Sequence, residues 1–260
     1  MTVDPKDQVR DFFSQHASSY AVSASHRAGR DLERLVALLA PTGVERLLDV
    51  ATGTGHTALA LAPQVREVIG LDLTLAMGKE FAALARERGF PHARFVVGDV
   101  EAVPFPEACF ELVTCRRAAH HFPNPARALA EMARVLSAGG RLGLVDMVAP
   151  EDPASAQFLN QLERARDTSH QRALSVSEWL ALVEASGLRV RIWEVMEEQY
   201  LWSQWLYPVP ADTPAAARAL ALAQTAGPDL ADVVVTTAQG DLIIRKRRII
   251  LVADKSGARR

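Results

Sequence analysis

Short apolar runs alternate with helix-like segments between residues 44 and 147, and this alternation limits the fold more than any other feature. The apolar runs are VERLLDV, EVIGLD, ARFVVGD, FELVTC and RLGLVDM, and the helix-like segments between them cover about 54–62, 74–88 and 125–136. Strands that alternate with helices pair in parallel through right-handed crossovers, and helices cover both faces of the resulting sheet. We therefore predict an α/β fold around a parallel sheet.

Segments on either side of this run extend the predicted fold. Helices are predicted over 5–18 and 31–39, the second with Asp31 as its N-cap. The elements predicted after residue 150 are a helix with the stripe Phe158, Leu159, Leu162 and Ala165, a helix capped by Ser177, a strand over 188–194, a helical insertion over 200–230, and a hairpin across Ala238 to Asp241 that ends in a long last strand. The basic residues at 245–248 are interpreted as a solvated strand edge.

Composition excludes several classes of protein. The 260 residues include 29 Lys and Arg against 31 Asp and Glu, and the formal net charge of −2 does not favour a nucleic-acid partner. Cys109 and Cys115 lack the spacing of a disulfide framework or a zinc site, which indicates a reducing, cytoplasmic setting. The sequence contains no secretory leader and no apolar run long enough for a membrane span, so we expect a soluble protein.

The functional prediction depends on a turn of small residues and on three aspartates at or near the ends of strands. Gly53 and Gly55 follow the first strand, where small residues let a polar ligand approach the backbone N–H groups. Together with Ala58 they also fit the dinucleotide fingerprint G-x-G-x-x-G/A, so a nicotinamide-dependent reductase is an alternative.

Three aspartates disfavour the nicotinamide alternative. Asp49 lies inside the strand before the glycines and could orient the turn and reach an amino-acid head group. Asp72 ends the second strand and could accept hydrogen bonds from both hydroxyls of a ribose. Asp99 follows the third strand and could accept from the exocyclic amine of an adenine. Together these positions describe a complete adenosine site.

The motifs that carry these residues resemble those of class I S-adenosylmethionine-dependent methyltransferases. The similar stretches are LLDVATGTGHT, GLD, GDVEAVPF and LSAGG, and TCRRAAHHFPNP, VDMVAPED and RDTSHQR are similar to the bacterial branch near the ubiquinone and menaquinone biosynthesis methyltransferases. The resemblance implies a Rossmann-like seven-stranded sheet of order 3-2-1-4-5-7-6 with strand 7 antiparallel. One departure is Ala51, where many members carry a glycine.

The resemblance also implies a cofactor, S-adenosyl-L-methionine, with S-adenosyl-L-homocysteine as product. The residues expected around it are Asp49, Ala51, Thr52 and Gly53 at the methionine moiety, Asp72 at the ribose, Leu73 and Met77 against the adenosine, Gly98, Asp99 and Val100 at the adenine, Cys115 at the end of the fourth strand, and Tyr20 as a lid. Met77 could equally be a core residue, and Tyr20 a surface or packing residue.

The segment after the fourth strand should face the methyl acceptor. His120 and His121 are adjacent there, so only one is expected to face the pocket, where it could act as a general base. Two histidines without a third ligand make a weak metal site, and we predict no metal. The candidate substrate contacts are Arg116 as an anchor for an anion, Asp146, Arg166 and His170, each of which could instead belong to a structural ion pair.

We therefore predict methyl transfer to a small organic acceptor, at carbon or oxygen, and no nucleic-acid partner or membrane span. The aromatic residues at 202–207 could roof the acceptor site or form a homodimer contact. A protein that binds the adenosyl ligand without turnover is the alternative from another class. The predicted single domain consists of an N-terminal helical cap (1–40), a cofactor-binding core (41–150), a substrate cover with the sixth strand (151–232), and a C-terminal hairpin and tail (233–260).

Overall fold

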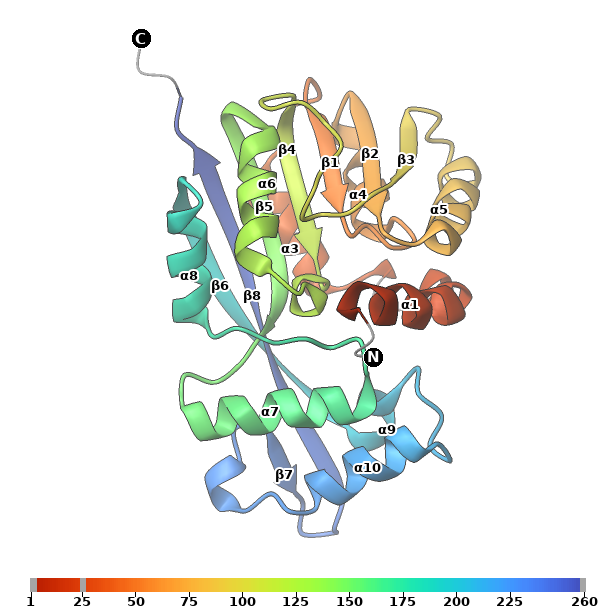
Figure 1. The fold of residues 1–260 in the computed structure, drawn as a ribbon, viewed down its shortest axis with the longest axis vertical. Coiled ribbons are helices and arrows are strands. Elements are labelled where there is room, and N and C mark those ends of the chain that lie inside the picture. The colour runs from red at the N-terminus through yellow and green to blue at the C-terminus, as the bar shows by residue number, and fades with distance from the viewer. Residues whose placement is uncertain (1–3, 24–26, 258–260) are drawn as a thin grey trace.

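The fold is built on one mixed β-sheet, seen in a computed structural model that describes residues 4–23 and 27–257. The order of the strands is β3-β2-β1-β4-β5-β8-β6, and the short β7 pairs with β8 (Figure 1). The strands are β1 (Arg46–Val50), β2 (Glu67–Asp72), β3 (Ala93–Val97), β4 (Phe110–Arg116), β5 (Leu136–Val148), β6 (Leu188–Leu201), β7 (Val234–Thr236) and β8 (Leu242–Lys255). Strands β1 to β5 are parallel, and β8 runs antiparallel to β5, β6 and β7.

Helices cover both faces of this sheet because each contributes an apolar stripe to a core. The helices are α1 (Pro5–Val22), α3 (Arg30–Leu39), α4 (His56–Leu61), α5 (Leu75–Glu87), α6 (Pro125–Val135), α7 (Pro153–Arg166), α8 (Val176–Ala185), α9 (Trp202–Leu206) and α10 (Pro214–Ala223). One core packs α6 and α8 on one face through residues such as Leu129 and Trp179. The other packs α3, α4 and α5 on the opposite face through residues such as Leu35 and Phe81.

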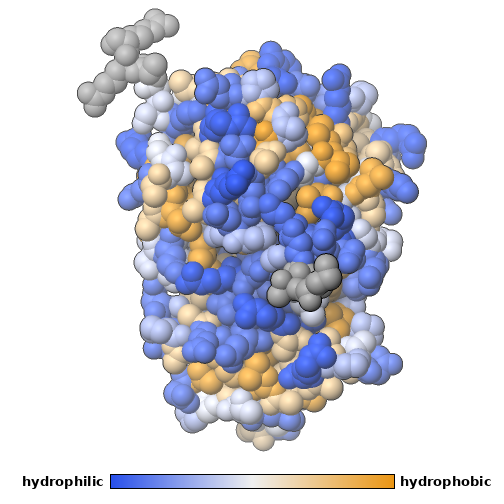
Figure 2. All heavy atoms as spheres, viewed as in Figure 1, coloured by the Kyte–Doolittle hydropathy of each residue, from blue (hydrophilic) through white to orange (hydrophobic). Residues whose placement is uncertain are grey.

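A third apolar cluster lies beyond the carboxyl ends of the parallel strands. It joins α7, α9 and α10 to β7 and the start of β8, with Leu162, Trp205 and Ile244 among its buried residues. Helix α1 crosses beneath the carboxyl ends of the parallel strands, between the sheet and this lower cluster (Figure 1). The face in Figure 2 is hydrophilic across the middle, with apolar patches above and below. Strand ends, α1 and the lower cluster therefore surround the place where parallel sheets bind ligands.

The predicted sheet order is confirmed, with one added strand. The first arm of the predicted hairpin is β7, so the antiparallel last strand is the eighth rather than the seventh. Strand β6 continues to Leu201, well beyond the predicted 194. No described helix is long and apolar enough to cross a membrane.

Two predicted helix caps are wrong. Gly29 is the N-cap of α3, and Asp31 instead lies buried in the first turn and binds Arg116 and Arg117. Helix α8 begins after Ser175, whose hydroxyl accepts from the Glu178 N–H while the Glu178 carboxylate accepts from the Ser175 N–H. This reciprocal pair satisfies two N–H groups, which a cap at Ser177 would not.

Candidate active site

The turn between β1 and α4 needs small residues for two separate reasons. Ala51, Gly53 and Gly55 all have left-handed backbones, with φ of 48°, 55° and 89°. A Cβ on Gly55 would lie 2.3 Å from Cδ2 of Phe81, so that position is also closed sterically. The turn can form because glycine adopts positive φ without strain, and it leaves the backbone open to a ligand.

Asp49 braces this turn from below. Its carboxylate accepts hydrogen bonds of 2.6 Å from the hydroxyls of Thr52 and Thr114, and only 2% of the residue is exposed. Burial raises the pKa of Asp49 to about 6, although both hydroxyls favour the ionised form. Asp49 fixes the turn against β4 and does not line the cavity above it.

The first of two cavities opens above the turn, at the ends of β1, β2 and β3; we call it the cofactor cavity. It encloses about 970 Å³ including its open mouth. Asp72 lies in its wall, with one carboxylate oxygen accepting from the Gly53 N–H at 2.8 Å and the other from the Thr74 N–H at 2.9 Å. Each oxygen keeps a lone pair for a further donor, as a ribose hydroxyl would supply.

The far end of the cofactor cavity is closed by an ion pair to α1. The Lys6 ammonium lies 2.7 Å from the Asp99 carboxylate and 2.7 Å from that of Glu101. The other oxygen of Asp99 accepts from the Glu101 N–H at 2.9 Å. The N-terminal helix is thus tied to the loop after β3 at the wall of the cavity.

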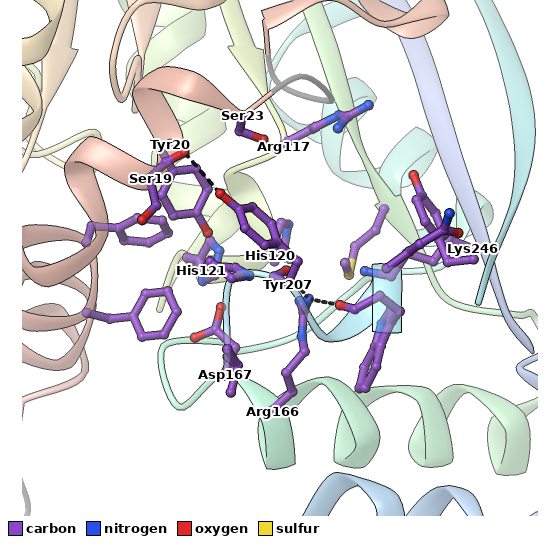
Figure 3. A pocket seen from close by; sticks show the side chains of 18 of the residues that line it. Ser19, Tyr20, Ser23, Arg117, His120, His121, Arg166, Asp167, Tyr207 and Lys246 are labelled. Carbon is purple, nitrogen blue, oxygen red and sulfur yellow. Dashed lines mark hydrogen bonds between the residues drawn. The ribbon is translucent and has the colours of Figure 1, made fainter. Parts of the chain in front are cut away.

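The second cavity, the acceptor cavity, lies between α1, the ends of β4 and β5, and the lower cluster (Figure 3). It encloses about 960 Å³ including its mouth. Its walls are Phe12, Phe13, Ser19, Tyr20, Ser23, Arg117, His120, His121, Asp146, Met147, Arg166, Asp167, Tyr200, Gln204, Trp205, Tyr207, Pro208, Val209, Lys246 and Arg248. Phe13, Tyr20, Arg117 and His121 also line the cofactor cavity, so the two cavities share one boundary.

His120 and Asp146 form a hydrogen-bonded dyad on the wall of the acceptor cavity. Both lie at the carboxyl ends of parallel strands: His120 lies in the short 3-10 helix Ala119–His121 after β4, and Asp146 lies near the end of β5. His120 donates from Nδ1 to the carboxylate at 2.6 Å and from its backbone N–H at 2.7 Å. Because Asp146 can only accept, the proton is fixed on Nδ1 and Nε2 is left as the basic nitrogen of the ring.

His121 belongs to a second chain of hydrogen bonds. Ser169 donates its hydroxyl proton to Asp167 at 2.5 Å and accepts from His121 Nδ1 at 3.1 Å. Burial and the neighbouring His120 lower the pKa of His121, so its ring is neutral near pH 7. No three His, Cys, Asp or Glu side chains within residues 4–23 and 27–257 are arranged to hold a metal ion.

Comparison with known proteins identifies the family and the fold. A family model described as a methyltransferase domain matches residues 48–144. The uncharacterized methyltransferase YcgJ of Bacillus subtilis is 43% identical over 176 residues, which are 68% of this chain and 70% of that protein. The chain belongs to the class I S-adenosylmethionine-dependent methyltransferases. Demethylmenaquinone methyltransferase of Renibacterium salmoninarum is 32% identical over 78% of this methyltransferase and 83% of its own length. A solved Bacillus halodurans structure described as a methyltransferase is 36% identical, with a TM-score of 0.83, over 88% of this chain and all of its own.

The methyltransferase brings most of the predicted cofactor residues into one wall. The cofactor cavity is lined by Tyr20, Ala51, Thr52, Gly53, Asp72, Leu73, Met77, Gly98, Asp99 and Val100. Asp49 and Cys115 are absent from this wall, because Asp49 is engaged below the turn by Thr52 and Thr114 and Cys115 is fully buried in the core. Met77 is 2% exposed, so it packs in the core and faces the cavity at once.

Several acceptor predictions need correction. Both His120 and His121 line the acceptor cavity, whereas only one was expected to face it. Arg116 lines the cofactor cavity instead, and its guanidinium binds Asp31 through two hydrogen bonds of 3.0 Å. His170 lies outside the wall because its Nε2 donates to Asn160 at 2.8 Å. Asp146 and Arg166 do line the acceptor cavity.

Sequence reasoning missed the basic residues of β8. Lys246 and Arg248 were assigned to a solvated edge, but both are buried and line the acceptor cavity. The alternation of side chains along a strand could have predicted this burial. Ile244, Lys246 and Arg248 share one face of the strand, while Arg245 is exposed on the other. Lys6 was missed because nothing local places the start of α1 against the loop after β3.

Proposed function

We propose that this methyltransferase transfers a methyl group from S-adenosylmethionine, held in the cofactor cavity, to a small organic acceptor held in the acceptor cavity. The observation that carries the proposal is the boundary shared by the two cavities, formed by Phe13, Tyr20, Arg117 and His121. Methyl transfer is a displacement that requires two bound molecules to meet at one place. Because the cavities draw residues from Lys6 to Arg248, we further propose that the chain works as a single domain.

The cofactor cavity suits an adenosyl ligand by the chemistry of its donors and acceptors. Asp72 offers lone pairs suited to two ribose hydroxyls, and Asp99 offers one suited to the amine of adenine. His56 lines the same cavity, and no described residue makes a hydrogen bond to its buried Nδ1, so this atom is available to hydrogen-bond a polar ligand. The bound cofactor supplies a methyl group activated by an adjacent sulfonium.

The protein's own contribution is alignment, exclusion of water and removal of a proton. Phe13 and Tyr20 place aromatic surface between the two ligands, which excludes water and favours a positively charged group. His120 can accept the proton of a hydroxyl or an acidic carbon at Nε2, because Asp146 holds Nδ1–H and stabilises the resulting imidazolium. This pair favours an acceptor that must lose a proton, at oxygen or carbon.

The proposal is tested by binding and turnover measured separately. Calorimetric titration with S-adenosylhomocysteine, S-adenosylmethionine and NAD should show the adenosyl ligands binding and NAD binding at least 100-fold more weakly. Incubation with S-adenosylmethionine and a set of phenols, quinols and hydroxy acids should then release S-adenosylhomocysteine with at least one acceptor. Tighter binding of NAD, or no binding of either adenosyl ligand, would contradict the proposal.

A further inference from the structure

Four cations line the acceptor cavity, and we call this set the basic wall. It consists of Arg117 after β4, Arg166 at the end of α7, and Lys246 and Arg248 on β8. Figure 3 shows Arg117, Arg166 and Lys246 arranged around the same cavity although they come from three separate elements. Both Lys246 and Arg248 are less than a tenth exposed.

The carboxylates that pair with the basic wall lie behind it. Asp31 is shared by Arg116 and Arg117, and Glu163 is shared by Arg166 and Lys246. Both carboxylates are 1% exposed, and neither lines the cavity. Each thus serves two cations, and Glu198, which pairs with Arg248, is likewise absent from the cavity wall. Asp167 is the carboxylate that lines the cavity beside Arg166, so the four cations of the wall outnumber the carboxylate that faces the ligand with them.

The buried cations of the wall lie close enough together to destabilise one another's charged forms. Burial and the nearby Arg117 together lower the pKa of Arg248 to about 9, against the opposing effect of Asp31. Burial also lowers the pKa of Lys246, with Arg166 and Arg117 acting in the same direction against Glu163. No described residue makes a hydrogen bond to the buried Nε of Arg166. A ligand anion would reduce this repulsion and supply acceptors to the wall.

Other groups of different character line the same cavity. His120 and Asp146 are among them, and they are hydrogen-bonded to each other. Tyr20, Tyr200 and Trp205 supply aromatic surface. The cavity therefore combines a proton acceptor, cations and flat apolar surface.

We propose that the methyl acceptor is a small planar organic acid whose carboxylate binds Lys246 and Arg248 and whose methylated atom faces His120. This inference rests on the proposed function and specifies its substrate class. The anion fixes the orientation of the acceptor, because a reversed molecule would place its carboxylate against Asp146 at a cost in free energy. The aromatic surface selects a flat molecule over a branched aliphatic one.

The test measures binding of small probes to the protein saturated with S-adenosylhomocysteine. Salicylate and benzoate are compared with their neutral analogues salicylamide and benzamide, with benzylamine and with phenyl phosphate. The carboxylates should bind at least 10-fold more tightly than their amides, and benzylamine should not bind. Salicylate should also release S-adenosylhomocysteine from S-adenosylmethionine faster than salicylamide does.

Variants of β8 show whether the basic wall is responsible. Lys246→Met and Arg248→Gln should each weaken benzoate at least 10-fold and leave benzamide unchanged, and Arg248→Lys should recover most of the loss. Arg245→Gln is the matched control, because Arg245 lies on the same strand and is exposed; it should leave benzoate binding unchanged. Binding of S-adenosylhomocysteine, measured for each variant, shows that the variant is folded.

Four outcomes would overturn the inference while the proposed function stands, provided the adenosyl ligands still bind. They are amides that bind as tightly as carboxylates, no carboxylate binding at millimolar concentration, equal losses in Arg245→Gln and Arg248→Gln, and phenyl phosphate binding more tightly than benzoate. The last would assign the site to phosphate esters. Failure of the adenosyl ligands to bind would instead contradict the proposed function itself.

Discussion

Ala51 adopts a backbone conformation that favours glycine, at the centre of the cofactor cavity. Its φ of 48° costs an alanine about 1 kcal/mol relative to glycine. Ala51→Gly should therefore raise the free energy of unfolding by about 0.5 to 1 kcal/mol, measured by urea denaturation, and leave affinity for S-adenosylhomocysteine within twofold. Ala217→Gly, at an exposed position inside α10, is the control and should lower stability by about 1 kcal/mol. A loss of stability in Ala51→Gly would show that the methyl group packs usefully.

The His120–Asp146 dyad makes a second prediction at the scale of residues. Asp146→Asn keeps the shape of the side chain but no longer offers a full carboxylate to Nδ1–H, so the basic nitrogen of His120 loses its fixed orientation. With an acceptor found in the turnover screen, kcat should fall about 100- to 10,000-fold. Affinity for S-adenosylhomocysteine should not change, because Asp146 does not line the cofactor cavity. Ser169→Ala is the control and should reduce kcat less, and equal losses would argue for His121 as the base.

The sequence predicts the place in the site of residues that directly follow a strand. It predicts less well the place of residues that are brought to the site by packing between distant segments. Asp72 and Asp99 are predictable because the carboxyl ends of parallel strands meet at one edge of a sheet. Asp49 and Cys115 lie inside their strands, where Asp49 is held by Thr52 and Thr114 and Cys115 packs in the core on one face of the sheet. Lys246 could have been found from strand alternation, but its distance from β4 in sequence hides its place in the site.

Helix α1 contributes residues to the walls of both cavities, and we expect a bound ligand to stabilise it. Within Pro5–Val22, Ala17 is the one residue that is buried, at 6% exposed, whereas Lys6, Val9, Phe13 and Tyr20 line the cofactor cavity. Few buried contacts of its own imply low local stability. Hydrogen exchange of α1 amides, followed by mass spectrometry, should therefore slow on addition of S-adenosylhomocysteine.

Helix α3 is the control for this experiment. It buries Leu35 and Leu39 completely against the sheet and lines neither cavity, so its exchange should be slow with or without ligand. Equal protection of α1 in both states would show that the cap is closed before ligand binds. A uniform slowing of α1 and α3 would indicate a global gain in stability instead.

Helices and strands are predictable from the sequence where their causes are local, and less so where they depend on distant parts of the chain. The parallel strands and α4 to α6 are predictable because their apolar periodicity and turns are local. Strand β6 is longer than predicted because it pairs with β8 up to Leu201, and the local sequence of β6 does not predict this pairing. Asp31 leaves the N-cap role because Arg116 and Arg117, far along the chain, supply stronger partners.

The whole molecule places several buried ionisable groups between the sheet and the lower cluster, so its stability should depend on pH. Burial lowers the pKa of His170 to about 2, with neighbouring His120 acting in the same direction, and burial also lowers the pKa of His121. Unfolded histidines titrate near 6.5, so their stabilising contribution is complete above that pH and is lost as the pH falls below it. Asp49 has the opposite sign: its raised pKa contributes stability below about pH 4 that is lost as the pH rises to about 6.

Opposite signs allow each contribution to be isolated with single variants. Urea denaturation at pH 7 and pH 5 should show that the native chain loses stability between these values, and that His170→Gln loses about 1 to 2 kcal/mol less, because glutamine takes up no proton and can still donate to Asn160. Asp49→Asn should change in the other direction, losing more than the native chain on going to pH 5, because it cannot regain stability by protonation. An unchanged pH dependence in His170→Gln would mean that the lower cluster opens enough to hydrate the ring, and the acceptor cavity would then be less enclosed than its walls indicate.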